Sequence, residues 1–289
     1  MDIGIRLHDT VNGTLEERLR YVREQGFSCA HLALSKTVAG FDMDDAPERL
    51  RDKDFAKEVR SAFLNTGMRC AVLGCYLNLA DANEERRKRT QEIYYAHLKF
   101  AKAIGAEVTG TETYANPELP YAKQAAESEE AFELFLESLR PVVQRAEEED
   151  TVLAVEPVWA HVISTPERAQ RMLEAIPSDH LRIILDAVNL IGPQTAARAD
   201  EIVADAIARL GDKVSVLHMK DYRLENGAMP AMACGLGNMK YERLIRFAKE
   251  KDLPMTLENT VPENAETARL YLEAVGKKLD RAEMNRDGD

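Results

Sequence analysis

The sequence lacks the long apolar runs and the N-terminal signals that direct proteins into or across membranes. No apolar stretch among its 289 residues approaches the roughly 20 residues that a membrane-spanning helix requires. Residues 1–5 contain neither the basic segment nor the apolar segment of a secretory signal. These absences predict a cytoplasmic protein with no membrane partner.

Cysteine is also scarce. The chain has four cysteines, Cys29, Cys70, Cys75 and Cys234, and no two of them form a C-x-x-C pair. Three of the four lie in or beside apolar runs typical of strands. A cysteine in apolar surroundings is usually a buried and unreactive thiol, so we expect a structural role for these side chains.

Basic residues are too few to suit a nucleic-acid-binding surface. The chain has 38 Lys and Arg against 50 Asp and Glu, which gives a net charge of −12 at pH 7. Proteins that neutralise a phosphate backbone need a basic surface. Nucleic acid is therefore excluded as an expected partner.

What is present is typical of one large globular domain. The composition is 45% hydrophobic and 30% charged, as in ordinary globular proteins. A length of 289 residues suits a single α/β barrel, which takes about 250 residues, better than two ordinary domains. We expect one barrel domain over residues 1–279, followed by a polar tail over 280–289 that is frayed.

Short apolar segments alternate with amphipathic segments along the chain. This alternation predicts eight strand-then-helix units, and hence a parallel sheet closed into a (β/α)8 barrel of the TIM type. The predicted strands are residues 3–7, 29–34, 69–73, 107–111, 152–156, 181–186, 214–218 and 255–258. The predicted helices are residues 14–25, 52–66, 83–104, 128–149, 166–176, 197–210, 241–251 and 263–279.

Glycines mark the ends of half of these helices. Gly26, Gly67, Gly105 and Gly211 each follow a predicted helix and precede an apolar strand by two or three residues. Glycine in the left-handed conformation is a common helix stop, so we expect that conformation at all four.

Four consecutive strands end in residues that bind metals. Glu156, Asp186, His218 and Glu258 each follow a buried apolar run, at intervals close to one strand–helix unit. In a barrel these side chains would meet at one end, where three carboxylates crowded together without a cation would repel one another. Three carboxylates and one imidazole form an oxygen-rich ligand set, which predicts a divalent metal site.

Further polar residues follow the predicted strands, and active sites of this fold lie at that end of the barrel. We expect His31, His97 and His180 to be structural, because they lie in or before regular elements. Lys220 and Asp221 could contact substrate or simply pair with each other. The residues predicted to bind substrate are His8, Glu112, His161, Asn189, Lys220 and Arg223.

These segments resemble those of a known superfamily over essentially the whole chain. The sequence is similar to the sugar phosphate isomerases and epimerases, the xylose-isomerase-like barrels that include the tagatose 3-epimerases. The resemblance implies that one divalent ion is held by Glu156, Asp186, His218 and Glu258. The segments that carry it are Val155–Pro157, Ile184–Asp186, Leu217–Asp221, Gly235–Gly237 with Tyr241, and Leu257–Asn259.

The oxygen-rich set makes Mn²⁺ the first choice of cofactor, with Mg²⁺, Co²⁺ and Zn²⁺ as alternatives. The resemblance also favours a homodimer or homotetramer. One departure from the tagatose-epimerase branch is Asn189, where that branch commonly has histidine in an Asp-x-x-His pattern. An amide cannot act as a base, and His161 is the imidazole that could replace it.

The expected activity is isomerisation or epimerisation of a small carbohydrate through a metal-bound cis-enediolate. Glu156 and Glu258 would move the proton, one on each face of the substrate. A lyase, dehydratase or glycoside-cleaving enzyme that acts on a keto-sugar with the same residues is an alternative, and a non-catalytic sugar-binding barrel is a second. Asn189 and the acidic surface disfavour an apurinic endonuclease. The choices between epimerisation and isomerisation, and among free sugar, sugar phosphate and keto-glycoside, stay open.

Overall fold

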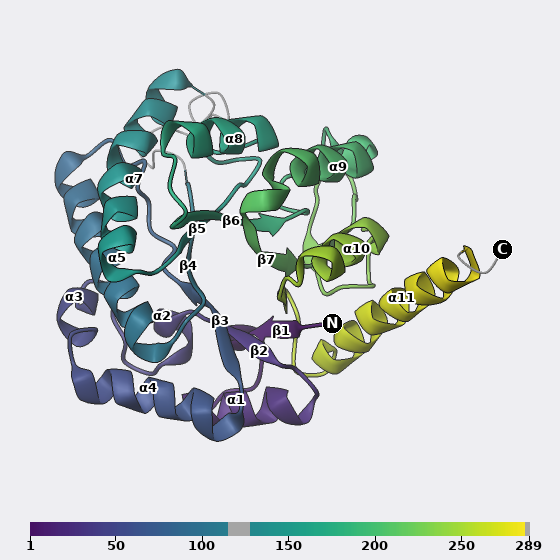
Figure 1. Cartoon of the computed structure of the whole chain (residues 1–289), viewed down its shortest axis with the longest axis horizontal. Helices are drawn as coiled ribbons and strands as arrows, with labels where there is room; N and C mark the ends of the chain where they lie inside the picture. The colour runs from purple at the N-terminus through teal and green to yellow at the C-terminus, as the bar shows by residue number, and fades with distance from the viewer. Residues whose placement is uncertain (115–127, 287–289) are drawn as a thin grey trace.

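The computed structural model describes residues 1–114 and 128–286, and the predicted closed parallel barrel is confirmed. Its strands follow one another around the barrel in chain order, and the last pairs with the first (Figure 1). They are β1 (Ile3–Arg6), β2 (Cys29–Leu32), β3 (Arg69–Gly74), β4 (Val108–Glu112), β5 (Leu153–Glu156), β6 (Leu181–Asp186), β7 (Val214–Met219) and β10 (Met255–Leu257).

Helices surround the strands on the outside of the barrel (Figure 1). Side-chain caps begin several of them: Thr14 and Glu17 form a reciprocal capping box at α1, and the Asn83 side chain accepts from the Arg86 amide at α5. The main helices are α1 (Leu15–Glu24), α4 (Lys53–Thr66), α5 (Glu84–Ile104), α7 (Glu129–Glu149), α8 (Pro166–Ala175), α9 (Ala199–Leu210), α10 (Glu242–Lys251) and α11 (Ala265–Arg286). None of the helices described is long and apolar enough to cross a membrane.

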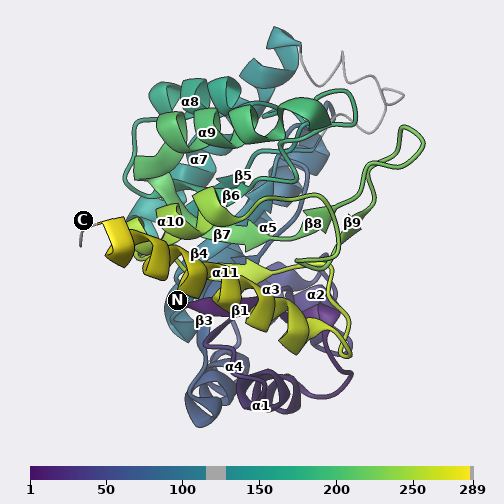
Figure 2. The same cartoon turned by 90° about the vertical axis from the view of Figure 1, so that its right-hand side faces the viewer.

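Several small elements were not predicted from the sequence. They include a one-turn helix after β1 (Leu7–Asp9), the short helices α2 (Leu34–Thr37) and α3 (Ala46–Arg49), and an antiparallel hairpin of β8 (Asp221–Tyr222) and β9 (Ala231–Met232). The hairpin projects from the end of the barrel at which β7 ends (Figure 2). The strand ends therefore open toward this side.

Three of the four predicted glycine stops are confirmed. Gly26, Gly67 and Gly105 have φ of +88°, +65° and +79°, in the left-handed region. The prediction for Gly211 is wrong, because its φ is −52° and the chain continues as a short 3₁₀ helix. A Cβ at Gly211 would lie 3.2 Å from Cε2 of Phe247. Glycine therefore serves close packing there and not a turn, because a Cβ would fit only if the Phe247 ring moved by a few tenths of an ångström.

The C-terminal helix continues past its predicted end at residue 279 to Arg286, and it runs beyond the body of the barrel (Figure 1). Ion pairs explain how this polar stretch is held. Asp280 accepts from Lys249 at 2.5 Å, and Glu283 lies 3.3 Å from Arg246, so both connect α11 to α10. Residues 287–289 of the predicted frayed tail lie outside the described residues.

The inside of the barrel is filled in layers. The apolar side chains of Cys29, Val72, Val108, Ala154, Ile184 and Val216 form one compact cluster. Successive side chains of a strand point to opposite faces, so the residue two positions further on each strand also points inward. All four cysteines are free and buried, as predicted.

Candidate metal centre and adjoining cavity

The alternation of the strands places the predicted metal ligands in one layer above the apolar cluster. Glu156, Asp186 and His218 come two residues after Ala154, Ile184 and Val216. The register pairs Asp186 with His218 across β6 and β7, and Thr256 with His218 across β10 and β7. Glu258 follows β10 directly and, like the other three, is buried.

His218 lies at the centre of this group. Its Nδ1 atom is 3.0 Å from Oε2 of Glu156 and 3.3 Å from Oε1 of Glu258. The candidate ligand atoms of Glu156, Asp186 and His218 all lie within 4.8 Å of one another. Glu258 joins His218 in a second such group, so the fold gathers the four predicted ligands into two groups that share His218.

The side-chain ammonium of Lys220 bridges two of these carboxylates, Asp186 and Glu258. Nζ of Lys220 lies 2.9 Å from Oδ2 of Asp186 and 3.2 Å from Oε2 of Glu258. Burial alone would lower the pKa of Lys220, but these two carboxylates outweigh it and raise that pKa above its ordinary value. Lys220 therefore supplies a fixed positive charge, and it does not pair with Asp221.

The pKa values of Asp186 and Glu258 shift in opposite directions. Burial raises the pKa of Asp186. Burial also acts to raise the pKa of Glu258, but His218, Lys220 and Arg6 outweigh it and hold that pKa well below its ordinary range. Burial acts to lower the pKa of His218, while Glu156 and Glu258 raise it to about 9. The buried group depends on positive charge for its stability.

The residues present fit a divalent cation. Nε2 of His218 is buried and has no partner within residues 1–114 and 128–286, while Nδ1 of His218 and Oδ2 of Asp186 have only the ion-pair contacts described above. Buried polar atoms are normally satisfied, and unpaired ones call for an explanation. An oxygen-rich set with an imidazole suits Mn²⁺, Mg²⁺, Co²⁺ or Zn²⁺.

Asn189 lies beside the metal carboxylates. Its Nδ2 donates to Oε1 of Glu156 at 2.5 Å, and its backbone N–H donates to Oδ1 of Asp186 at 3.0 Å. The amide therefore orients Glu156, a contact that a histidine in this position would have to replace. Contacts of this kind fix the orientation of metal ligands.

A cavity of about 380 Å³ lies on the other side of Glu258, toward the strands of the first half of the chain. This volume is within the range of small-molecule sites, about 300–1,000 Å³. Its polar lining includes Arg6, His8, His31, Lys36, Tyr76, Glu112 and Glu258. The fold thus brings the predicted residues His8 and Glu112 to the cavity, next to a predicted metal ligand.

Glu112 and His161 form a pair at the edge of this cavity. Glu112 is in register with Glu156 on the neighbouring strand, and its Oε2 lies 3.7 Å from Nδ1 of His161. Burial, and then Glu156, raise the pKa of Glu112 to about 8. Burial lowers the pKa of His161 to about 4, and its ring stacks on Tyr114 with centroids 5.1 Å apart. His161 is therefore a neutral imidazole near neutral pH.

Arg223 lies in a different place from the other predicted residues. It follows β8 in the hairpin, where its guanidinium donates to the Leu236 carbonyl at 2.5 Å and lies 3.6 Å from Glu225. It is absent from the lining of the cavity over the described residues. Asp221 holds the same loop, since its carboxylate accepts from the amides of Gly235, Gly237 and Met239.

Two residues at the centre of the site were missed from the sequence, Arg6 and His31. Arg6 lies 3.1 Å from Oε2 of Glu258 and 2.8 Å from Asp9. His31 is buried, with Nδ1 3.8 Å from Oε1 of Glu258. The available signal was the strand period: both residues come two positions after an inward-facing residue, Gly4 or Cys29.

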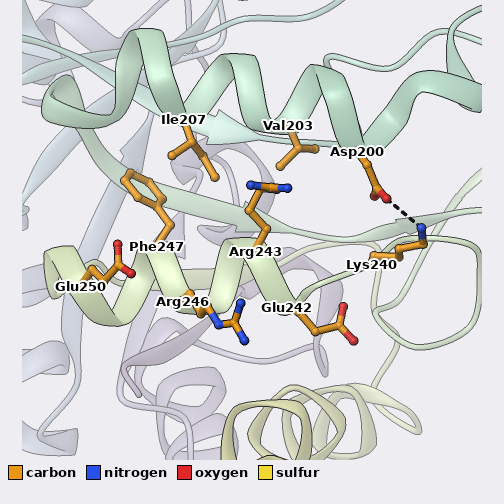
Figure 3. A pocket seen from close by; sticks show the side chains of 9 residues that line it. All are labelled: Asp200, Val203, Ile207, Lys240, Glu242, Arg243, Arg246, Phe247 and Glu250. Carbon is orange, nitrogen blue, oxygen red and sulfur yellow. Dashed lines mark hydrogen bonds and ion pairs between the residues drawn. The ribbon is translucent and has the colours of Figure 1, made fainter. Parts of the chain in front are cut away.

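A second hollow, of about 410 Å³, lies on the outer wall between α9 and α10 (Figure 3). Lys240 and Asp200 form an ion pair at 2.7 Å at one end, and the Arg243 side chain extends toward α9 (Figure 3). The described residues that line it include none of the predicted site residues. The barrel mouth is the better candidate site.

The fold and this group of side chains define a β/α barrel with a candidate divalent-metal centre at the carboxyl ends of its strands. The chain belongs to the family described as the xylose isomerase-like TIM barrel, whose model matches residues 19–275. A comparison with curated proteins found no match.

Solved structures share the fold at low sequence identity. One is a 3-keto-D-glucoside 4-epimerase from E. coli, with 19% identity, a TM-score of 0.73, and 95% of this chain and 99% of that chain covered. A D-psicose 3-epimerase from Clostridium cellulolyticum H10 has 15% identity, a TM-score of 0.71, and 96% and 99% coverage. An IOLI protein with a bound zinc atom has 17% identity, a TM-score of 0.67, and 97% and 96% coverage.

Proposed function

We propose that this protein is a divalent-metal-dependent isomerase or epimerase of a small carbohydrate. The observation that carries the proposal is the arrangement of Glu156 and Glu258. Both carboxylates contact His218. Glu156 ends β5 and Glu258 follows β10, the two strands that flank the β6–β7 pair in the barrel, and Glu258 also lines the cavity. Two carboxylates beside a cation site and a small-molecule cavity suit proton transfer to and from a bound sugar.

Glu156, Asp186, His218 and Glu258 would hold one divalent cation, with Mn²⁺ as the first choice and Mg²⁺, Co²⁺ or Zn²⁺ as alternatives. When bound, such a cation supplies positive charge beside the carbonyl and hydroxyl oxygens of a hydroxyketone or hydroxyaldehyde, and so acidifies the carbon-bound hydrogen between them. The zinc atom named for the IOLI neighbour supports a metal in this fold.

The protein's own residues prepare the two carboxylates for proton transfer. His218, Lys220 and Arg6 keep the Glu258 carboxylate ionised, the form in which a carboxylate acts as a base, with Arg6 and Lys220 at 3.1 and 3.2 Å from its Oε2. Asn189 holds Oε1 of Glu156 and leaves Oε2 toward His218. Return of the proton to the opposite face gives epimerisation, and return to the neighbouring carbon gives isomerisation.

The cavity supplies the groups that would bind the sugar. Its lining is rich in hydrogen-bonding side chains, which matches a polyhydroxylated ligand. His8 and Glu112 line the cavity, and Nδ1 of His161 lies 3.7 Å from Oε2 of Glu112. We also assign substrate contacts to Asn189, Lys220 and Arg223, of which Arg223 would depend on movement of its hairpin. The chain would act as a homodimer or homotetramer in the cytoplasm.

The names of the neighbours support a sugar substrate, since they include epimerases of a keto-glucoside, of psicose and of ribulose. The test is a screen of ketoses, aldoses, their phosphates and keto-glycosides with Mn²⁺ in deuterated water, read by NMR. Deuterium incorporation with an isomeric product is the expected result. Elimination products with the same residue dependence would establish a lyase. Sugar binding without exchange into any candidate would establish a binding protein and overturn the proposal.

A further inference from the structure

His31 is a buried histidine whose position the proposed mechanism does not yet explain. It lies on β2 with a side chain only 1% exposed, and its Nδ1 has no hydrogen-bond partner within the described residues. That nitrogen points at the metal group, 3.8 Å from Oε1 of Glu258. Candidate ligand atoms of His31, His218 and Glu258 lie within 4.8 Å of one another. A second imidazole thus faces the centre from the opposite side of the barrel.

The outer nitrogen of His31 is held in the way typical of metal-binding histidines. Nε2 lies 3.1 Å from the hydroxyl of Tyr76. In metal sites the nitrogen that does not bind the ion usually contacts a hydrogen-bonding group, which fixes the tautomer and the ring orientation. With Tyr76 accepting from Nε2–H, the lone pair of His31 is on Nδ1 and faces the carboxylates.

The backbone of β3 makes room for this arrangement. A Cβ at Gly74 would lie 2.8 Å from Nε2 of His31 and 2.5 Å from Cε2 of Tyr76. A Cβ essentially never comes this close to another heavy atom, so any side chain at Gly74 would displace the pair. The ring of His31 is fixed from its other face as well, because it stacks on His218 with centroids 5.1 Å apart and planes at 12°.

His97 shows what a purely structural histidine looks like in this chain. It is fully buried in α5, its Nδ1 is 2.9 Å from the Ile93 carbonyl of its own helix, and its Nε2 has no hydrogen-bond partner among the described residues. An unpaired ring nitrogen alone therefore does not mark a ligand, and what the nitrogen faces decides. His31 differs in each respect that matters: its unpaired nitrogen faces a carboxylate and a second imidazole, and its outer nitrogen contacts a phenol.

We propose that His31 is an additional ligand of the divalent cation, so that the metal centre contains two imidazoles. The inference rests on the proposed metal centre and extends it beyond the Glu156, Asp186, His218 and Glu258 set. Tyr76 is then a positioning residue that orients His31. A second imidazole moves the preference of an oxygen-rich site from Mn²⁺ and Mg²⁺ toward Zn²⁺ or Co²⁺.

The direct test counts imidazoles and needs no substrate. The full chain is stripped of metal, loaded with one equivalent of Cu²⁺ as the probe, and measured by pulsed EPR, which detects the remote nitrogen of each coordinated imidazole. The expected count is two in the wild type and one in His31→Gln. A count of one in the wild type, or an unchanged count in His31→Gln, overturns the proposal, and the wild-type measurement decides it even if the variant does not fold.

Zinc affinity, measured by competition with a chromophoric chelator, gives a second readout. Loss of a contact to a metal ligand typically costs about 10–100-fold in affinity. His31→Gln should therefore weaken Zn²⁺ by at least about 100-fold, and Tyr76→Phe by about 10-fold. The matched control is His161→Gln, a histidine at the same end of the barrel outside both candidate ligand groups, which should leave Zn²⁺ affinity unchanged. Equal loss in His31→Gln and His161→Gln overturns the proposal.

The outcomes also separate this inference from the proposed function. If the ion carries two imidazoles but no sugar takes up deuterium, the assignment of His31 as a ligand is supported and the proposed isomerase or epimerase activity is refuted. If deuterium exchange occurs but the ion carries only one imidazole, the proposed activity is supported and the assignment of His31 as a ligand is refuted.

Discussion

The two halves of the barrel mouth are built from different chemistry. On the side of β5, β6, β7 and β10, the inward layer consists of Glu156, Asp186, His218 and Glu258, buried side chains whose charges are balanced in part by Lys220. On the side of β3 and β4 the same layer contains Gly74 and Gly110, which leave space beside Tyr76. One half concentrates charge and the other provides volume. The candidate metal ligands and the cavity therefore have separate walls, which meet at Glu258.

The largest effect should come from the charged half. Asp186→Ala removes a carboxylate whose two oxygens accept from the backbone at Val188 and from Lys220. Binding of a divalent cation should be lost while the barrel still folds, because the side chain lies above the apolar layer. Metal content by elemental analysis and circular dichroism measure the two results. Full metal content in this variant would show that Asp186 is not a ligand.

Substitution of the proposed proton-transfer pair, Glu156 and Glu258, should reduce turnover more than metal binding, in contrast to Asp186→Ala. Glu156→Gln and Glu258→Gln each keep the shape and one oxygen donor but cannot accept a proton. We expect partial metal retention and a fall in turnover of at least about 10²-fold, the usual cost of losing a general base. Rates of deuterium wash-out from each epimer would assign one residue to each face.

A result that contradicts this assignment would be wild-type turnover in both Gln variants. The base would then have to be sought elsewhere at the barrel mouth, at His161 or His8. An isomerase that works through one face would leave one of the two variants still exchanging the proton.

Glu112 connects the two halves, and its ionisation should reduce stability. Its pKa in the folded state, about 8, lies above the ordinary value of 4.5. The neutral carboxyl is therefore favoured by folding: its stabilising contribution is complete below pH 4.5, declines as the pH rises, and is lost above about pH 8. Glu112→Gln stays neutral, so it should gain stability relative to the wild type as the pH rises.

Urea unfolding of metal-free protein at pH 5 and pH 9 measures this difference. The variant should be more stable than the wild type at pH 9, by on the order of a few kcal/mol, and nearly equal to it at pH 5. A matched control is Glu148→Gln on the exposed surface of α7, which should show no such pH dependence. The same stability difference at both pH values would contradict the raised pKa.

The sequence was sufficient to predict the charged half of the mouth, and the reason is physical. A carboxylate at the end of an apolar run stands out, since a buried strand tolerates charge only where it ends. The same logic predicts the barrel itself, because eight apolar runs alternating with capped helices leave few other topologies.

The other half could not be predicted in the same way. His31 lies inside an apolar run, where a histidine is compatible with a plain core position, and its partner Glu258 is more than 200 residues away in the chain. Arg6 has the same difficulty. Register and strand alternation decide which residues share a layer, and a register shift between Ala30 and His31 in the pairing with β3 is not visible in the sequence.

The smallest effect should come from filling the space beside Tyr76, and two glycines allow a matched comparison. An alanine Cβ at Gly74 would lie 2.8 Å from Nε2 of His31, whereas one at Gly110 would lie 2.8 Å from the terminal methyl groups of Ile184 and Val72. Overpacking a barrel interior costs about 1–3 kcal/mol, so both variants should lose stability to urea by a similar amount. Their effects on the metal centre should differ.

Gly110→Ala presses on apolar side chains below the ligand layer, and its Cβ would lie 3.4 Å from the Tyr76 hydroxyl, an ordinary contact distance. Gly74→Ala displaces His31 or Tyr76, and through them the nitrogen that faces Glu258. We expect Zn²⁺ affinity to fall by about 10-fold in Gly74→Ala, as for the loss of an outer contact to a ligand, and to stay unchanged in Gly110→Ala. Equal zinc affinities in two variants of equal stability would show that the space beside β3 serves packing alone, and that the charged half of the mouth holds its cation without help from the other.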